Sequence, residues 1–186
     1  MQKKQMTAIR IAMNAVMIGA YIALSYAAIM ILGRWKITFE HFPVVLSAVM
    51  FGPADAVLVG GIGELINQFF TYGLTPTTAL WVLPIVARGL MLGLCAKLWK
   101  RQVSSSAICS KAVPVIFMIV CVLSGIISSG LNTLALYVDS KMLGYYTYAM
   151  VFGALLVRIV LSCVTSVIMV IGTKAVLHAL YKARLI

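Results

Sequence analysis

Acidic side chains are rare in this sequence, which has four Asp and Glu against 15 Lys and Arg in 186 residues. Charged residues of both signs make up 10% of the chain, whereas a soluble domain carries about 25%. Hydrophobic residues make up 63%, which is more than a water-soluble core of this size needs. The composition therefore excludes an ordinary soluble domain and predicts an integral membrane protein.

Motifs for energy conversion and catalysis are also absent. The chain has no G-x-x-x-x-G-K-[ST] phosphate-binding loop, so we expect it not to hydrolyse ATP itself. It has no HExxH, no paired carboxylates and no G-x-S-x-G, which argues against an intramembrane enzyme. No inverted repeat of the kind common in self-sufficient secondary carriers is apparent. We therefore expect no enzyme activity, no cofactor and no metal site.

Cysteines and basic residues fit a membrane protein rather than a redox or nucleic-acid-binding protein. The four cysteines show no CxxC spacing and are interpreted as small residues of membrane helices. The basic residues lie at the ends of apolar runs, as the positive-inside rule describes, so we expect no nucleic acid partner. The lipid bilayer of the cell membrane is the expected environment.

Apolar runs predict an all-α bundle, because a membrane-spanning helix needs about 20 apolar residues. The predicted spans are 8–32, 40–52, 54–73, 77–99, 112–137 and 146–174. The second is short and contains Pro43, so it either crosses fully or forms a re-entrant pair with the third. Both arrangements keep the basic groups near residues 3–10, 97–111 and 174–184 on one side, which the positive-inside rule makes cytoplasmic. We predict one compact domain, residues 1–186, of six transmembrane helices with both termini in the cytoplasm.

A row of small residues marks one face of the first predicted helix. Its members recur at steps of three or four residues and are Ala8, Ala12, Ala15, Gly19, Ala23 and Ala27. This spacing keeps them on one helical face, and small side chains let membrane helices approach each other closely. The row therefore packs either against the protein's own helices or against a different subunit.

Polar residues share one face of the third predicted span. Glu64, Asn67, Gln68 and Thr71 stand at positions i, i+3, i+4 and i+7. An ionisable group inside a membrane span costs several kcal/mol unless it is paired or hydrated, so such a group is by default a candidate for function.

Two arginines and two tryptophans extend this set. Trp81 and Arg88 lie seven residues apart on one face of the fourth span, and Arg158 lies inside the sixth. One hypothesis is that Glu64 pairs with Arg88 or Arg158 and fixes helix packing. The other is an outward-facing pocket in which carboxylate and amide groups bind a flat heterocycle, Trp35 or Trp81 stacks on it and an arginine meets an anionic group.

Aromatic residues near the start of the sixth span have two interpretations. Tyr145, close to Tyr146 and Tyr148, either joins the pocket or anchors the chain at the membrane interface. Asn132 on the fifth span is a further candidate for the pocket. Asp139 is expected in a solvated loop.

The segment ITFEHFPVVLSAVMFGPADAVLVGGIGELI at 37–66 resembles the substrate-binding S components of energy-coupling factor (ECF) vitamin transporters. It is similar to the family's extended lead-in, apolar helix with an early proline, FGP turn and glycine-rich third helix that ends in an acidic position. The six spans and the alanine-rich first helix extend the resemblance over nearly the whole chain. The resemblance implies that the A-x-x-x-A pairs Ala8/Ala12 and Ala23/Ala27 meet a membrane-embedded T component.

The resemblance also implies that two ATP-binding subunits power uptake through the T component, while the S component topples in the membrane to release its substrate inward. Folate-type members look closest, although they usually carry Asp where this chain has Glu64, and TYGLTPTTALWVLPIVARG departs from their pattern. The expected substrate is folate or a related pterin, or else hydroxymethylpyrimidine or pyridoxine. The alternative function is a stand-alone secondary carrier of a small organic solute.

Overall fold

The protein is a bundle of helices with one short β-hairpin. The computed structural model describes residues 2–27, 29–31, 35–102 and 115–182. Its helices are α1 (Gln2–Tyr26), α2 (Phe42–Met50), α3 (Pro53–Tyr72), α4 (Thr78–Gln102), α6 (Val115–Met142), α7 (Tyr148–Phe152) and α8 (Leu155–Lys182). Between α1 and α2, the antiparallel strands β1 (Ile29–Ile31) and β2 (Trp35–Ile37) pair with Met30 opposite Lys36.

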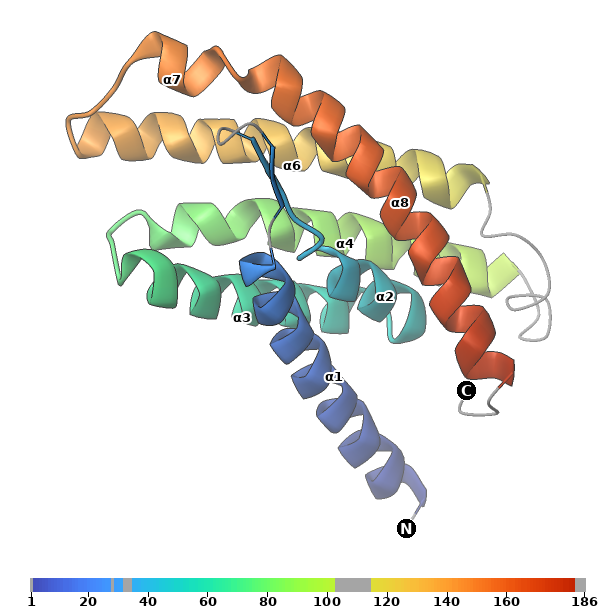
Figure 1. Cartoon of the computed structure of the whole chain (residues 1–186). Coiled ribbons are helices and arrows are strands. Elements are labelled where there is room, and N and C mark those ends of the chain that lie inside the picture. Colours follow the sequence, from blue (N-terminus) through green and yellow to red (C-terminus); the bar gives the residue numbers. More distant parts are fainter. Residues whose placement is uncertain (1, 28, 32–34, 103–114, 183–186) are drawn as a thin grey trace.

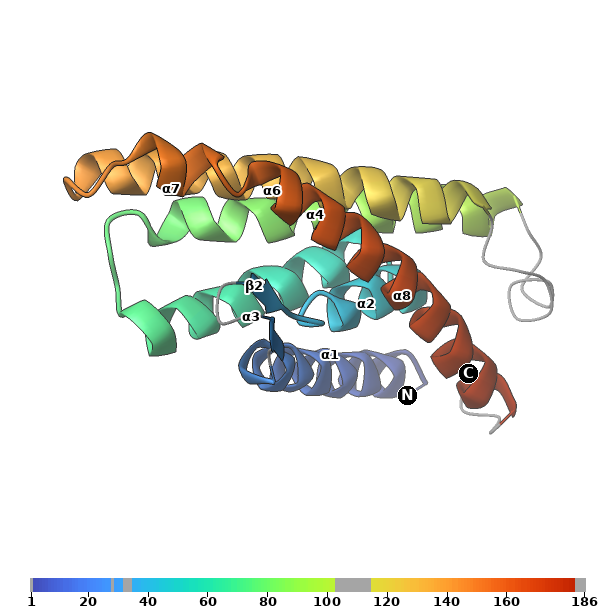
Figure 2. The same cartoon turned by 45° about the horizontal axis from the view of Figure 1, so that its top comes forward.

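Helices α3, α4, α6 and α8 run in alternating directions through the bundle, whereas α1 runs parallel to α3 (Figure 1). The N- and C-termini lie at the same end of the molecule, and the turns after α3 and α6 lie at the opposite end. In Figure 2, α4 and α6 lie above α3, α1 lies below it, and α8 runs diagonally across the bundle. The shared position of the termini agrees with six alternating segments, and the cytoplasmic assignment of that end stays a prediction.

Four helical segments of the described chain are long and apolar enough to cross a membrane. They are Ala8–Tyr26, Thr78–Trp99, Val115–Met142 and Tyr148–Ala179. Helix α2 has nine residues, which at 1.5 Å per residue span about 14 Å of a hydrocarbon layer about 30 Å thick. The helical part of the predicted span 40–52 is therefore too short to cross the membrane alone.

Helix α2 instead fills the centre of the bundle, where it packs against α3, α4 and α8. Its residues from Pro43 to Val49 are all buried, and four of them pack with Tyr21, Val59, Ile85 and Leu92 in the apolar core: Val44, Val45, Ala48 and Val49. Burial on every side explains why this segment reads as a continuous apolar run.

The first and last predicted spans also differ from the observed helices. The first predicted span, 8–32, ends early, because α1 stops at Tyr26 and Ile29–Ile31 form a strand. Its β-branched isoleucines suit an extended backbone as well as a membrane helix. The sixth, 146–174, is interrupted at Gly153 between α7 and α8, where glycine favours a break in the helix.

Glycine and proline build the turn between α2 and α3. Gly52 has a φ of 101°, which lies in the region that favours glycine. Pro53 begins α3, where its missing N–H costs nothing. Gly93 of α4 lies directly against this turn, since a Cβ atom there would come 2.2 Å from the Cα atom of Pro53. Helices α3 and α4 therefore pack backbone to backbone at this point.

Candidate functional site

The polar face of the third predicted span packs against α1. Glu64 is buried and accepts hydrogen bonds from the hydroxyl of Tyr21 and from Nε2 of Gln68, both at 2.7 Å. Asn67 Nδ2 donates a long hydrogen bond of 3.4 Å to Glu64 Oε2. The side-chain amide oxygen of Asn67, Oδ1, accepts a hydrogen bond of 2.9 Å from the hydroxyl of Ser25. The carboxylate is therefore satisfied by protein donors from both helices, and we call these five residues the α1–α3 cluster.

Neither intramembrane arginine pairs with Glu64. The salt bridge found in the described part of the chain joins Arg10 of α1 to Asp55 of α3. Arg88 donates to Ser166 Oγ of α8 at 2.8 Å instead. The hypothesis of an ion pair between Glu64 and an arginine is therefore wrong, because α1 rather than α4 or α8 covers the polar face of α3.

A cavity of about 660 Å³ lies elsewhere, bounded by α4, α6, α7, α8 and the segment that joins β2 to α2. It is lined by Ile37, Thr38, Glu40, His41, Arg88, Ser128, Ser129, Asn132, Ala149, Met150, Gly153, Ala154, Arg158, Leu161, Ser162 and Thr165. Small-molecule sites in proteins measure about 300–1,000 Å³. The cavity therefore has the size of a binding site for a small organic molecule.

Arg88 brings a buried positive charge to this cavity. Its side chain is 2% exposed, and one terminal nitrogen bonds Ser166 and lies 4.0 Å from the sulfur of Cys121. Its Nε atom has no hydrogen-bond partner among the described residues, and the same is true of Nδ1 of His41. Buried polar atoms are normally paired, so an unpaired atom in a residue that lines a cavity is a candidate partner for a bound molecule.

Hydroxyl and amide groups complete the lining from two helices. Arg158, Ser162 and Thr165 stand at i, i+4 and i+7 and so share one face of α8. The polar residues that α6 contributes are Ser128, Ser129 and Asn132. The sequence pattern identified Arg158 and Asn132 but missed the hydroxyl residues and His41. The helical spacing of Ser162 and Thr165 after Arg158 could have indicated that they share its face of the helix.

The predicted substrate-binding residues fall into separate places. Arg88 and Arg158 line the cavity, whereas Glu64, Asn67 and Gln68 belong to the α1–α3 cluster. The fold thus divides these polar residues into two neighbouring groups, since the ring of Tyr21 in the α1–α3 cluster lies 6.3 Å from the ring of His41 on the cavity lining. Contact of any of these residues with substrate stays a prediction.

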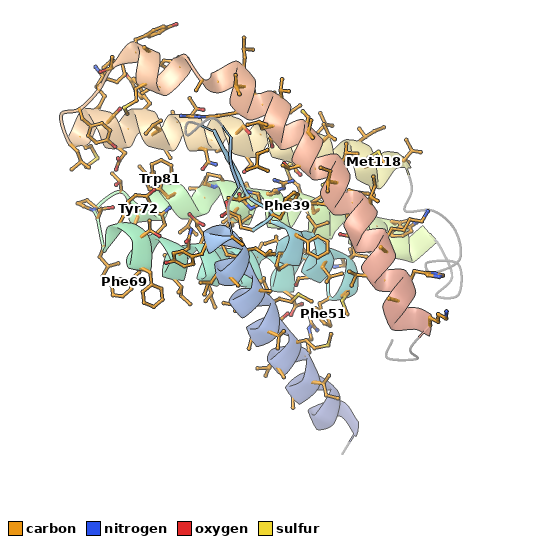
Figure 3. All side chains as sticks on the ribbon, viewed as in Figure 1. Phe39, Phe51, Phe69, Tyr72, Trp81 and Met118 are labelled. Atoms are coloured by element: carbon orange, nitrogen blue, oxygen red, sulfur yellow. The ribbon has the colours of Figure 1, made fainter. Side chains whose placement is uncertain are left out.

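The other predicted site residues lie outside the cavity lining. Thr71 is exposed near the end of α3. Trp81 is half-buried near the start of α4 (Figure 3). The backbone of Trp35 begins β2, and its side chain lies outside the described structure. Thr71 and Trp81 lie at the end of the bundle that holds the α3–α4 turn, outside the cavity lining.

Tyr145 is held by a carboxylate at that same end. Its hydroxyl donates a hydrogen bond to Asp139, and this bond raises the pKa of Tyr145 to about 12. Asp139 is buried and also accepts a hydrogen bond from Thr77, which precedes α4. The expectation of a solvated Asp139 is therefore wrong, because α6 extends past it and the carboxylate joins two loops.

The small-residue row of α1 faces away from the bundle. All six members are exposed: Ala8, Ala12, Ala15, Gly19, Ala23 and Ala27. A Cβ atom added at Gly19 would meet nothing within 4 Å. The buried polar residues of α1, Asn14, Tyr21 and Ser25, point instead toward α3. The row therefore does not pack against the described helices, and docking on another subunit stays a prediction.

Comparison with known proteins identifies the family. Residues 6–185 match the family model described as the substrate-specific component of ECF transporters, which is nearly the whole chain of 186 residues. No curated protein matches the chain. The family match confirms the predicted resemblance, although it does not specify a folate-type member, and it agrees with the apolar helices of the fold. The chain belongs to the substrate-specific components of ECF transporters, which are transporter subunits rather than enzymes and work with a T component and ATPases.

Proposed function

We propose that this chain is the high-affinity binding subunit of an ECF importer for a water-soluble vitamin and that the cavity holds the vitamin. The observation that carries the proposal is that two residues lining a cavity of about 660 Å³, Arg88 and His41, each have a buried polar atom, Nε and Nδ1, without a hydrogen-bond partner in the described structure. An apolar membrane protein keeps such atoms unpaired at a cost of about 1–3 kcal/mol each unless a ligand satisfies them. Folate or a related pterin is the first candidate, followed by hydroxymethylpyrimidine and pyridoxine.

The exposed row of α1 supplies the second half of the proposal. It offers a flat strip of alanine and glycine in which the Gly19 position has open space around it. Without a hydrophobic driving force between helices in lipid, such strips associate by close van der Waals contact. We infer that the T component docks along this strip and that the ATPases act through it.

Binding is tested on the purified chain. The protein is extracted in mild detergent, small molecules released from it are identified by mass spectrometry, and the vitamin found is titrated back by calorimetry. We expect one vitamin to co-purify and to rebind tightly. If no vitamin is released and none binds, the proposed function is wrong.

The same preparation separates the alternative function. A stand-alone carrier reconstituted in liposomes takes up the vitamin without ATP, whereas the proposed subunit does so only after the T component and ATPases are added. Uptake by this chain alone would establish the carrier and refute the proposal.

Docking is tested by enlarging the strip. The double substitution Ala12→Leu with Ala23→Leu fills two exposed positions of α1, so we expect vitamin binding to persist while co-purification with the T component and uptake are lost. Ala79→Leu is the matched control, because Ala79 is also exposed but lies at the start of α4. If the double variant still assembles and transports like the control, T component docking on this strip is wrong.

A further inference from the structure

The cavity carries an excess of positive charge. Its lining includes two arginines, Arg88 from α4 and Arg158 from α8, and one acidic residue, Glu40. Placing cations in a site enclosed by apolar helices is costly unless an anion compensates them. A vitamin that is neutral would leave this excess uncompensated inside the membrane.

Arg88 has no acidic partner that would compensate its positive charge in the part of the chain that the structure describes. A buried guanidinium usually faces a carboxylate, yet Arg88 donates to the neutral hydroxyl of Ser166. Its Nε atom is buried and unpaired in the described structure. Guanidinium groups bind carboxylate and phosphate through adjacent N–H donors, and Arg88, which lines the cavity, has one such donor without a partner among the described residues.

Arg158 lies at a different level of the same cavity. Ser166, which anchors Arg88, follows Arg158 by eight residues on α8, a rise of about 12 Å. Ser162 and Thr165 line the cavity between the two levels. The arrangement suits an elongated molecule with its anionic end beside Arg88 and a polar body along the hydroxyl groups of α8.

We propose that the substrate is an organic anion whose carboxylate or phosphate binds Arg88, with Arg158 adding a second positive charge. This inference rests on the proposed function and deepens it by naming the substrate class. Among the candidates, it favours a folate-type acid over hydroxymethylpyrimidine and pyridoxine, which carry no acid group.

Matched pairs of compounds test the charge directly. The probes are nicotinate with nicotinamide, pantothenate with pantothenol, biotin with biotinamide, folate with its bis-amide, and pyridoxal phosphate with pyridoxal. Binding to the detergent-purified chain is measured by calorimetry or thermal shift. We expect at least one acid to bind at least about 30-fold more tightly than its neutral relative, the ratio that corresponds to about 2 kcal/mol. The pyridoxal phosphate pair distinguishes a phosphate from a carboxylate.

Variants then assign the effect to the arginines. Arg158→Gln removes the charge of a half-buried side chain, so the variant should still fold. The ratio of the affinity for the acid to the affinity for its neutral relative should fall toward one. Arg88→Lys keeps the charge but loses the Nε donor. It should weaken binding of the acid while leaving the affinity for the neutral relative unchanged. Lys174→Gln is the matched control, since Lys174 is exposed on α8 and lies outside the cavity lining; its acid preference should equal that of the unmodified chain.

The outcomes separate this inference from the proposed function. Tight binding of a neutral vitamin, or equal binding of acid and neutral relatives, overturns the inference and leaves the vitamin-binding function intact. An acid preference that Arg158→Gln and Arg88→Lys both preserve also overturns it. Binding of no probe, together with no co-purified vitamin, overturns both.

Discussion

Gly93→Ala tests the closest helix contact in the fold. The added Cβ atom would lie 2.2 Å from Cα, 2.6 Å from N and 2.8 Å from Cβ of Pro53. Ordinary contact begins at 3.4 Å, and the first two of these atoms are backbone atoms that no rotamer change can move. The α2–α3 turn must therefore shift by about 1.2 Å, and overpacking of this kind costs about 1–3 kcal/mol.

The expected result is a loss of thermal stability. For a domain of this size 1 kcal/mol corresponds to about 2–4 °C, so a cost of about 2 kcal/mol lowers the unfolding temperature by about 4–8 °C. The measurement is thermal unfolding in detergent, followed by size-exclusion chromatography with fluorescence detection. Gly130→Ala is the control, because a Cβ atom there meets nothing within 4 Å and alanine favours the helix. Equal unfolding temperatures for the two variants would refute backbone-to-backbone packing at Gly93.

Two further predictions concern polar side chains. Glu64→Gln leaves Tyr21 and Gln68 without a charged acceptor, so we expect a stability loss of about 1–3 kcal/mol with an unchanged vitamin affinity; weaker binding with unchanged unfolding would instead place Glu64 at the substrate. Because Asp139 raises the pKa of Tyr145 to about 12 from 10.0, the unfolded chain loses this proton first, and stability falls as pH rises between these values. Tyr145→Phe should remove that part of the fall in unfolding temperature above pH 10, and an unchanged slope would contradict the hydrogen bond.

Hydrophobic runs and turn residues predict much of this fold. The FGP turn appears where Gly52 and Pro53 require it, because one supplies a positive φ and the other begins a helix. The end of α1 was not predictable from hydropathy, since Ile29–Ile31 are apolar in either a strand or a helix. Boundaries inside continuous apolar sequence depend on tertiary contacts that a run of isoleucines does not reveal.

The site was harder to predict than the helices. Helical spacing correctly placed Glu64 and Gln68 on one face, because they interact one turn apart on α3. Spacing cannot say which helix covers that face, and it is α1, through Tyr21, that does so. The arginines were recognised as intramembrane charges, but spacing could not show that Arg88 of α4 and Arg158 of α8 line one cavity, because that depends on how α8 crosses the bundle.

Helix α1 is tied to α3 at two levels. Arg10 and Asn14 both bond Asp55 near one end of α3, and Tyr21 bonds Glu64 about two and a half turns further along α3. Because these hydrogen bonds join the helices at two levels, α1 cannot rotate freely relative to α3. A partner that binds the outer side of α1 therefore also constrains α3. If such a partner reorients α1, then α1 and α3 must move together as one rigid unit. The two helices would then shift relative to the rest of the bundle, at the contacts between this pair and the other helices.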